Sequence, residues 1–194
     1  MTAKAMSDDA TKANASVDPR SPYVLDTTPL GRRPGAMRAE SRTLTAPADL
    51  GLDMIGVPEG ADIELDLQLE AVMEGVLASG TARAPLSGEC ARCLDPVSRD
   101  LQVDLQELYV YPESETAGEE ERRLVGDLLD IEPTLRDAVV LALPLSPLCQ
   151  DDCPGLCAQC GARLADVGSE HDHGEAIDPR WKALEGLFDK GEET

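Results

Sequence analysis

The sequence predicts an α+β protein in which an antiparallel β-sheet precedes a C-terminal helix and a set of zinc-binding turns. Three observations lead to this prediction: alternating apolar residues lie early in the chain, a helical apolar pattern lies late, and all six cysteines and both histidines fall into close pairs. Strands grouped before a helix favour an antiparallel sheet over a parallel one. The 194 residues suffice for one domain with tails, and we expect that domain to span residues 20–190.

The N-terminal part divides by composition into a tail and a basic arm. Residues 1–19 are rich in alanine, aspartate, lysine, serine and threonine, a composition typical of disorder. Residues 20–45 form the arm, and arginines give residues 20–42 a net charge of +3 within a chain whose total is −21. Within the arm, residues 22–28 and 37–45 are expected to be short extended segments.

Residues 46–110 are predicted to be rich in β-structure. In residues 62–70 apolar and polar side chains alternate at every position, which is the clearest strand pattern in the chain. Residues 72–86 continue as an extended run, in which Gly75 and Gly80 are expected to mark bulges or bends.

A further strand is predicted over residues 97–110. Its apolar residues alternate up to Leu105 and then change phase to Leu108 and Val110, so a β-bulge is expected between them. Residues 111–124 follow as an acidic loop.

Two helices are predicted in the second half of the chain. Within residues 125–148, the segment 133–143 has apolar residues at helical spacing. The stripe they form consists of Leu135, Ala138, Val139, Ala142 and Leu143. Residues 176–190 hold a second helix that begins at the N-cap Asp178, and residues 191–194 form a tail. The apolar stripe of this second helix consists of Trp181, Leu184 and either Leu187 or Phe188.

The paired cysteines and histidines are the strongest functional signal. Most of them lie in the region 149–175, and the full set is Cys90, Cys93, Cys149, Cys153, Cys157, Cys160, His171 and His173. Eight soft or borderline ligands in four pairs are the number needed for two closed tetrahedral zinc sites. A short gap within a pair lets the backbone wrap around one ion, and Gly161 suits the left-handed turn behind such a pair.

Two assignments of these ligands to metal ions are open. The favoured one takes ligand pairs from separate turns. Its first zinc is bound by Cys90, Cys93, Cys149 and Cys153, and its second zinc by Cys157, Cys160, His171 and His173. The competing assignment places all four cysteines of residues 149–160 on one zinc.

Other uses of the cysteines fit the sequence less well. No apolar run marks a signal peptide or a membrane span, so we expect a cytoplasmic protein, in which disulfides are disfavoured. A redox Cys-x-x-Cys pair of the thioredoxin type requires a βαβ unit around it, which the pattern lacks. The chain also has no nucleophile elbow, phosphate loop or dinucleotide-binding glycines, so we predict no enzyme activity and no catalytic residue.

The charge indicates which partners the protein takes. A net charge of −21 opposes DNA binding through a general positive field and favours basic partners. Within the basic arm, the turn over residues 30–35 presents Arg32 and Arg33, which with Arg38 are candidates for contact with RNA phosphates or another partner. The alternative is that intramolecular ion pairs hold these arginines against the acidic body.

Several spaced motifs resemble the YceD/DUF177 family, of the actinobacterial type. The resemblance covers roughly residues 20–190. Its motifs, in chain order, are Pro22-Tyr-Val-Leu-Asp26, Leu30-Gly-Arg-Arg-Pro-Gly35, Gly88-Glu-Cys-Ala-Arg-Cys-Leu-Asp-Pro96, Arg136-Asp-Ala-Val-Val-Leu-Ala-Leu-Pro-Leu145, Pro147-Leu-Cys-Gln-Asp-Asp-Cys-Pro-Gly-Leu-Cys-Ala-Gln-Cys-Gly161 and Asp178-Pro-Arg-Trp181. Where similar proteins carry a further Cys-rich or Cys/His pair, this chain has His171-Asp-His173.

The resemblance implies a non-enzymatic role in accumulation of large-subunit ribosomal RNA and in ribosome assembly. It implies the pre-large ribosomal subunit or a basic ribosomal protein as the partner. An alternative is a zinc-dependent, redox- or stress-responsive protein-binding module, for which Arg92 between Cys90 and Cys93 is a sign. A metal-dependent enzyme is a third hypothesis, and only the many carboxylates favour it.

Overall fold

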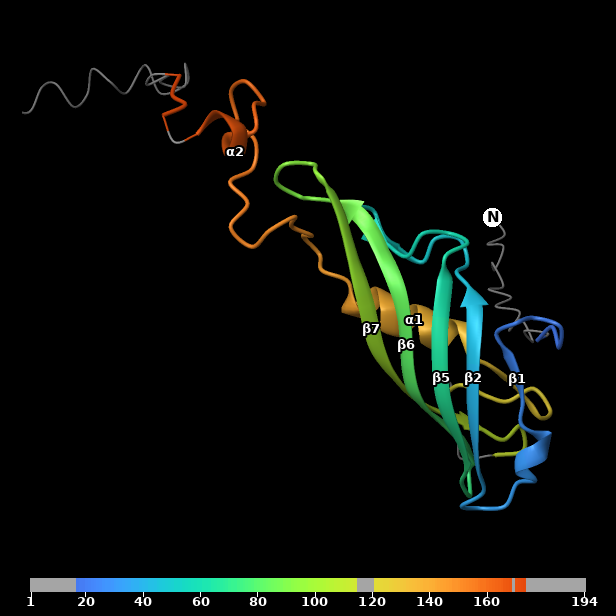
Figure 1. Ribbon diagram of the computed structural model, residues 1–194. Helices are drawn as coiled ribbons and strands as arrows, with labels where there is room; N and C mark the ends of the chain where they lie inside the picture. The colour runs from blue at the N-terminus through green and yellow to red at the C-terminus, as the bar shows by residue number, and fades with distance from the viewer. Residues whose placement is uncertain (1–16, 115–120, 169, 174–194) are drawn as a thin grey trace, which may run out of the picture.

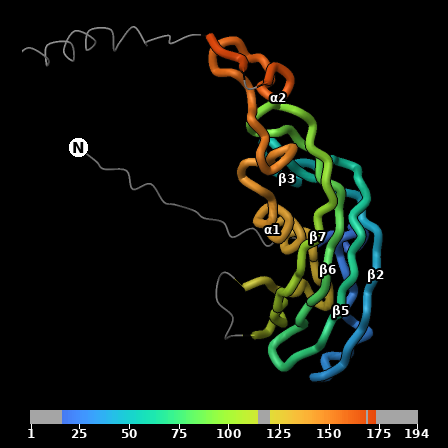
Figure 2. Tube along the Cα trace, turned by 60° about the vertical axis from the view of Figure 1, so that its left-hand side comes forward, coloured from blue at the N-terminus to red at the C-terminus, as the bar shows by residue number. Residues whose placement is uncertain are grey.

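A curved antiparallel sheet with a helix on one face forms the body of the protein (Figures 1 and 2). The computed structural model describes residues 17–114, 121–168 and 170–173. Four long strands pair in the order β2 (Met37–Thr45), β5 (Asp62–Ala71), β6 (Gly75–Glu89) and β7 (Pro96–Val110). This confirms a mainly antiparallel sheet with few helices.

Smaller elements surround the main sheet. Their bounds are β1 (Val24–Asp26), the 3₁₀ helix η1 (Thr28–Leu30), β3 (Gly51–Leu52), β4 (Ile55–Gly56), β8 (Leu128–Asp130), α1 (Glu132–Ala142) and α2 (Leu164–Val167). The β3–β4 hairpin extends the main sheet by pairing with the end of β6, whereas β1 and β8 pair with each other. Strands β3, β4 and β8 could not be predicted from the sequence pattern, because runs of two or three residues show no periodicity.

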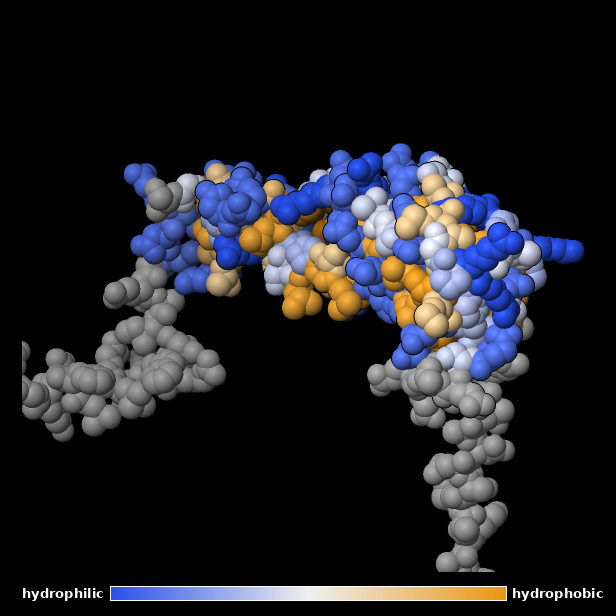
Figure 3. Space-filling view, turned by 90° about the horizontal axis from the view of Figure 1, so that it is seen from below, coloured by the Kyte–Doolittle hydropathy of each residue, from blue (hydrophilic) through white to orange (hydrophobic). Residues whose placement is uncertain are grey.

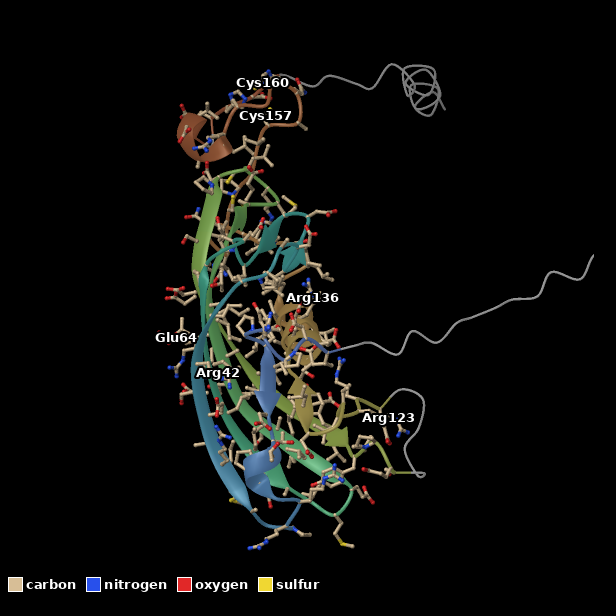
Figure 4. All side chains as sticks on the ribbon, turned by 90° about the vertical axis from the view of Figure 1, so that its right-hand side faces the viewer. Arg42, Glu64, Arg123, Arg136, Cys157 and Cys160 are labelled. Atoms are coloured by element: carbon tan, nitrogen blue, oxygen red, sulfur yellow. The ribbon has the colours of Figure 1, made fainter. Side chains whose placement is uncertain are left out.

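Only one face of the main sheet is packed. In β5 the residues Ile63, Leu65, Leu67 and Leu69 are all buried, while the acidic residues between them are exposed. Helix α1 and the β1–β8 pair lie on the buried side, so that Glu64 and Arg136 are on opposite sides of the sheet (Figure 4). The strict alternation of residues 62–70 therefore predicts both the strand and its open acidic face.

Of the bulges or bends expected at Gly75 and Gly80, no bulge is present. Pairing of β6 runs without interruption against β5 and against β7. Both positions need glycine for another reason: a Cβ atom on Gly75 would lie 2.0 Å from the carbonyl oxygen of Tyr109, and one on Gly80 would lie 2.0 Å from that of Asp66. The glycines thus permit close approach of neighbouring strands rather than an extra residue.

The phase change expected in β7 is also wrong. Tyr109, and not Leu108, continues the buried row that contains Val103 and Leu105. Val110 is buried as well, because the chain at residues 122–124 returns to pair with it: the backbone N–H of Val110 donates to Arg122 and that of Leu124 donates to Val110. Tyr109 is therefore a core residue of β7, although its hydroxyl is polar.

Helix α1 lies where the sequence predicts it and packs against β7 and β3. Leu135, Val139 and Leu143 are buried as expected, but Ala142 is exposed and Thr134 is buried in its stead. Thr134 is buried because it shares a hydrogen bond of 2.6 Å with the buried hydroxyl of Tyr109. The apolar stripe is therefore narrower than predicted and contains one polar contact.

The expected arm is part of the body. Residues 37–45 form β2 at an edge of the main sheet, and residues 24–26 form β1. The tail at residues 1–16, the central part of the acidic loop and the helix expected over residues 176–190 lie outside the described residues. In the part of the chain that the structure describes, no helix is both long enough and apolar enough to cross a membrane.

We expect Tyr109→Phe to lower the free energy of unfolding by about 1 kcal/mol at neutral pH, because a buried hydrogen bond between β7 and α1 is lost. Burial raises the pKa of Tyr109 to about 12 from its ordinary value of 10.0. The contribution of the Tyr109 hydroxyl to the free energy of unfolding is therefore complete below pH 10, and it is lost as the pH rises through 12. Denaturant unfolding at several pH values measures both effects, and the variant should lose less stability at high pH than the parent.

Tyr111→Phe is the matched control at neutral pH, because the buried hydroxyl of Tyr111 has no hydrogen-bond partner among the described residues. It should leave stability unchanged or raise it. Equal losses in the two variants would contradict the role given to the Tyr109–Thr134 contact.

Candidate metal centres

The first cluster joins the β6–β7 turn to the segment that follows α1. Cys90 and Cys93 lie between the end of β6 and the start of β7, and Cys149 and Cys153 lie in the segment after α1. All four sulfur atoms are within 4.8 Å of one another. We call these four residues the Cys90 cluster.

The distances within the Cys90 cluster fit a tetrahedral thiolate site. Cys90 Sγ lies 3.8 Å from Cys153 Sγ, and Cys93 Sγ lies 3.6 Å from Cys149 Sγ. These separations exceed a disulfide bond of about 2.05 Å, and all six cysteines are free. An ion with Zn–S bonds of about 2.3 Å at tetrahedral angles separates its sulfur ligands by about 3.8 Å. The residues present therefore fit zinc.

Backbone contacts position the ligands of the Cys90 cluster. The N–H of Ala91 donates to the carbonyl oxygen of Pro147 (2.7 Å), which ties the turn to the segment after α1. Arg92 Nη1 donates to the carbonyl oxygen of Cys153 (2.9 Å) and Arg99 Nη2 to that of Leu148 (2.6 Å). These arginine contacts were not predicted, although both arginines lie within a few residues of a cysteine pair.

The second cluster contains Cys157, Cys160, His171 and His173, again with all ligand atoms within 4.8 Å of one another. Cys160 Sγ lies 3.4 Å from His171 Nε2, and the Nε2 atoms of the two histidines are 2.9 Å apart. The structure thus groups the side chains as in the favoured assignment and not as in the competing one. Whether they bind a metal ion remains a prediction, and we call them the Cys160 cluster.

The turns behind both Cys-x-x-Cys pairs have the same geometry. The N–H of Gly161 donates to the carbonyl oxygen of Cys157 (2.8 Å), and the N–H of Leu94 donates in the same way to Cys90 (2.9 Å). Gly161 has φ +72° and Leu94 has φ +62°, so each residue is in the left-handed region. Glycine suits this region, whereas leucine is strained there.

The two clusters differ in exposure. Cys90 is 0% exposed, and Cys93 and Cys153 are also buried, while Cys160 and His173 in the second cluster are exposed. The Cys160 cluster lies at one end of the molecule, beyond the tips of β6 and β7 (Figures 1 and 4). Cys149 is the exposed member of the first cluster. A metal in the first site would therefore be shielded on the side of its three buried ligands, and one in the second would be open to solvent.

In the Cys90 cluster the surrounding groups lower the pKa of Cys90 and raise the pKa of Cys93. Burial disfavours the Cys90 thiolate, yet backbone N–H groups of Arg92, Cys149 and Cys93 donate to it and lower its pKa to about 6. Burial and the hydrogen bond with Cys90 raise the pKa of Cys93 to about 12. A divalent cation reverses such opposition, because it stabilises every thiolate that it contacts.

Polar contacts link the two clusters. Arg163, immediately before α2, forms an ion pair with Asp95, which also accepts a hydrogen bond from the Cys93 thiol (3.3 Å). The N–H of Leu164 donates to the carbonyl oxygen of Gly155 (3.0 Å). Asp95 therefore connects a ligand of the first cluster to the turn that carries the second.

The candidate arginines differ in how they are held. Arg32 pairs with Glu113 (3.2 Å) and Asp127 (3.1 Å) and lies 4.8 Å from the centre of the Tyr111 ring. Arg38 pairs with Glu40 (3.1 Å). The expectation of ion pairs to the acidic body is thus confirmed for Arg32, whereas Arg38 pairs with a glutamate of its own strand.

Arg33 is the exception among the candidate arginines. It is exposed, and among the residues that the structure describes it has no ion-pair or hydrogen-bond partner for its side chain. Of the three predicted contact residues, Arg33 alone is both exposed and unpaired within the described ranges. Its role in binding stays a prediction.

Replacing Leu94 with glycine is expected to stabilise the protein by up to about 1 kcal/mol, because glycine removes the strain at φ +62°. Leu94 is exposed, so little packing is lost. Thermal unfolding of the metal-loaded protein measures the change. Leu94→Ala keeps a Cβ atom and should not stabilise; stabilisation by alanine equal to that by glycine would contradict the strain argument.

Comparison with known proteins places these clusters in a family. Residues 78–188 match the family described as large ribosomal RNA subunit accumulation protein YceD. The chain belongs to the YceD family. Both clusters lie within the matched region, whereas β1, β2 and β5 precede it.

Similar proteins come from mycobacteria and from Bacillus subtilis. An uncharacterized protein of Mycobacterium tuberculosis is 51% identical over 169 residues, which are 84% of this chain and 80% of that protein. One of Mycobacterium leprae is 46% identical over 173 residues, 87% of this chain and 78% of the other. YlbN of Bacillus subtilis is 26% identical over 114 residues, 56% of this chain and 66% of YlbN. No solved structure matches the chain.

Proposed function

We propose that this YceD-family protein is a non-enzymatic, zinc-binding factor that supports accumulation of large-subunit ribosomal RNA and assembly of the ribosome in the cytoplasm. Membership of the YceD family carries the proposal. The two Cys/His clusters support it, because closed sets of four ligands suit a structural ion rather than a catalytic one with an open position.

The proposed zinc ions would act on shape. One would be held by the Cys90 cluster and the other by the Cys160 cluster. A bound Zn²⁺ supplies a fixed tetrahedral crosslink, which joins the β6–β7 turn to the chain after α1 in the first site. The second site would fold the short segment around α2, which buries no side chain of its own.

The proposed partner is the pre-large ribosomal subunit or a basic ribosomal protein. The charge of −21 and the open acidic face of the sheet suit a basic protein. Arg33, exposed in the turn before β2, suits a local contact with an RNA phosphate. The two contacts are on different parts of the molecule and are compatible.

Sedimentation of the tagged protein from lysate through a sucrose gradient, at low and moderate salt, tests the proposal. We expect co-migration with large-subunit precursors and weaker co-migration for Arg33→Ala. Arg83→Ala is the matched control, because it removes the same charge from the open sheet face. Two results together would overturn the proposal. The protein would sediment only at the top of the gradient, and deletion of its gene would leave the level of large-subunit RNA unchanged.

The exposure of the Cys160 cluster favours a second candidate function, a zinc-dependent module that responds to oxidants. Peroxide would oxidise Cys157 and Cys160 to a disulfide, be reduced to water, and release the metal. Release of about one zinc equivalent at low peroxide, with loss of a bound partner, would support this function. Release only at doses that also unfold the Cys90 cluster would count against it.

A further inference from the structure

A groove between the end of α1 and the β3–β4 hairpin is lined by exposed leucines. Leu141 is 85% exposed, Leu145 is 89% exposed, and Leu52 on the β3–β4 hairpin is 36% exposed. Pro144 and Leu145 on one side and residues 51–55 on the other line a groove of about 390 Å³. Figure 3 shows hydrophobic side chains exposed in the narrow region between the body and the segment that carries the Cys160 cluster. We call this hollow the Leu145 groove. Leu52 and Leu145 line it, and Leu141 is an exposed side chain on the last turn of α1, four residues before Leu145.

The backbone holds these leucines on the surface. Leu143, between Leu141 and Leu145, is buried, and so is Pro147 after them. The buried Leu143 and Pro147 therefore hold the chain against the body on either side of Leu145, while residues 144–146 between them are all exposed. Grouped exposed apolar side chains of this kind mark contact sites in soluble proteins.

The surroundings of the Leu145 groove are acidic. Asp53 lines the groove, and an adjoining hollow on the same hairpin is lined by Asp49, Leu52 and Asp53. Within the described residues neither carboxylate has an ion-pair partner. Arg136, whose guanidinium donates to the carbonyl oxygen of Asp49 (2.8 Å), is itself paired with Glu132. This surface therefore repels phosphates and attracts cations.

We propose that the Leu145 groove binds a basic polypeptide segment, which inserts apolar side chains between the leucines and places lysine or arginine beside Asp49 and Asp53. Apolar anchors with charged flanks are the usual form of such contacts. RNA does not suit this groove, because it would bring phosphates to unpaired carboxylates. The inference deepens the proposed function by giving its protein partner a docking site, and it rests on that function only for the partner's place in ribosome assembly.

The test measures binding of a fluorescent amphipathic peptide of leucine and lysine to the full-length, metal-loaded protein by anisotropy. Replacing Leu141 and Leu145 together by serine should weaken binding by about tenfold or more. Met73→Ser removes an equally exposed side chain (86%) in the β5–β6 turn and should not. Asp49→Asn with Asp53→Asn should weaken binding and its salt dependence. Glu74→Gln with Glu121→Gln is the matched control, because it removes two exposed carboxylates outside the groove and outside the open sheet face.

Three results would overturn the proposal. Equal affinity of the leucine variant and the parent would mean that the peptide binds by general charge attraction. Equal affinity for a leucine–glutamate peptide would remove the charge selectivity. A shift of the emission of Trp181, the single tryptophan, in the leucine variant without peptide would show that the chain's own C-terminal segment occupies the groove. None of these results bears on co-sedimentation with precursors, so the failure of this inference and the failure of the proposed function are distinguishable.

Discussion

Cys90→Ser should remove one of two bound zinc equivalents and lower the free energy of unfolding by about 3 kcal/mol or more. Cys90 is fully buried, and its cluster joins segments 63 residues apart in the sequence. Loss of this ligand leaves an incomplete set of three thiols, of which Cys93 and Cys153 are buried, and it opens a long loop. Metal content by mass spectrometry and thermal unfolding of the same samples measure the two effects.

Cys160→Ser is the matched control, because it removes a ligand of the same type from the exposed cluster. It should also cost one zinc equivalent, but the main sheet should unfold at nearly the parent temperature. A Cys90→Ser protein that has lost its metal, unfolds like the parent and restores ribosomal RNA levels in a deletion strain would contradict the structural role of the first site.

Gly80→Ala should destabilise the sheet by about 3 kcal/mol or more, because the new Cβ atom would lie 2.0 Å from the carbonyl oxygen of Asp66. Gly80 is paired on both sides, with Leu67 of β5 and Leu105 of β7, so neither neighbouring strand can move without loss of hydrogen bonds. Denaturant unfolding measures the loss. If the parent protein is only marginally stable, the variant should not accumulate in soluble form.

The control for Gly80→Ala is Gly60→Ala, in a turn where φ is +80° and no atom lies within 4 Å of the added Cβ. Only backbone strain of about 1 kcal/mol is expected there. Similar losses at the two positions would mean that backbone strain, and not contact between strands, explains the requirement for glycine at residue 80.

The parts of the fold that local pattern decides were predictable. Strand β5 and helix α1 follow from apolar residues at periods of two and of 3.6, and the turn at Gly161 follows from its glycine. The predictions for β6 and β7 were wrong at residues that occur in more than one environment. Tyr109 is apolar over most of its surface and polar at its hydroxyl, so its core position in β7 was overlooked, and glycines that permit close approach of strands were interpreted as bulges.

The candidate site was predictable in its ligand types but not in its surroundings. Cysteine and histidine in close pairs indicate a metal by chemistry alone. The contacts of Arg92 and Asp95 that position the Cys90 cluster depend on which segments meet, and the sequence has no pattern for that. The same holds for two adjacent arginines: Arg32 meets Glu113 and Asp127 of distant segments, whereas Arg33 has no acidic partner among the described residues.

The sequence by itself determined the ligands, the alternating strands and the acidic charge of this YceD-family protein, because each depends on residues close together in the chain. The tertiary structure alone decided that the β6–β7 turn meets the chain after α1, and that three ligands of the Cys90 cluster are buried whereas no ligand of the Cys160 cluster is. It also decided that Leu145, after α1, faces solvent beside unpaired carboxylates. These properties depend on packing between segments far apart in sequence, whose free energy no local pattern encodes.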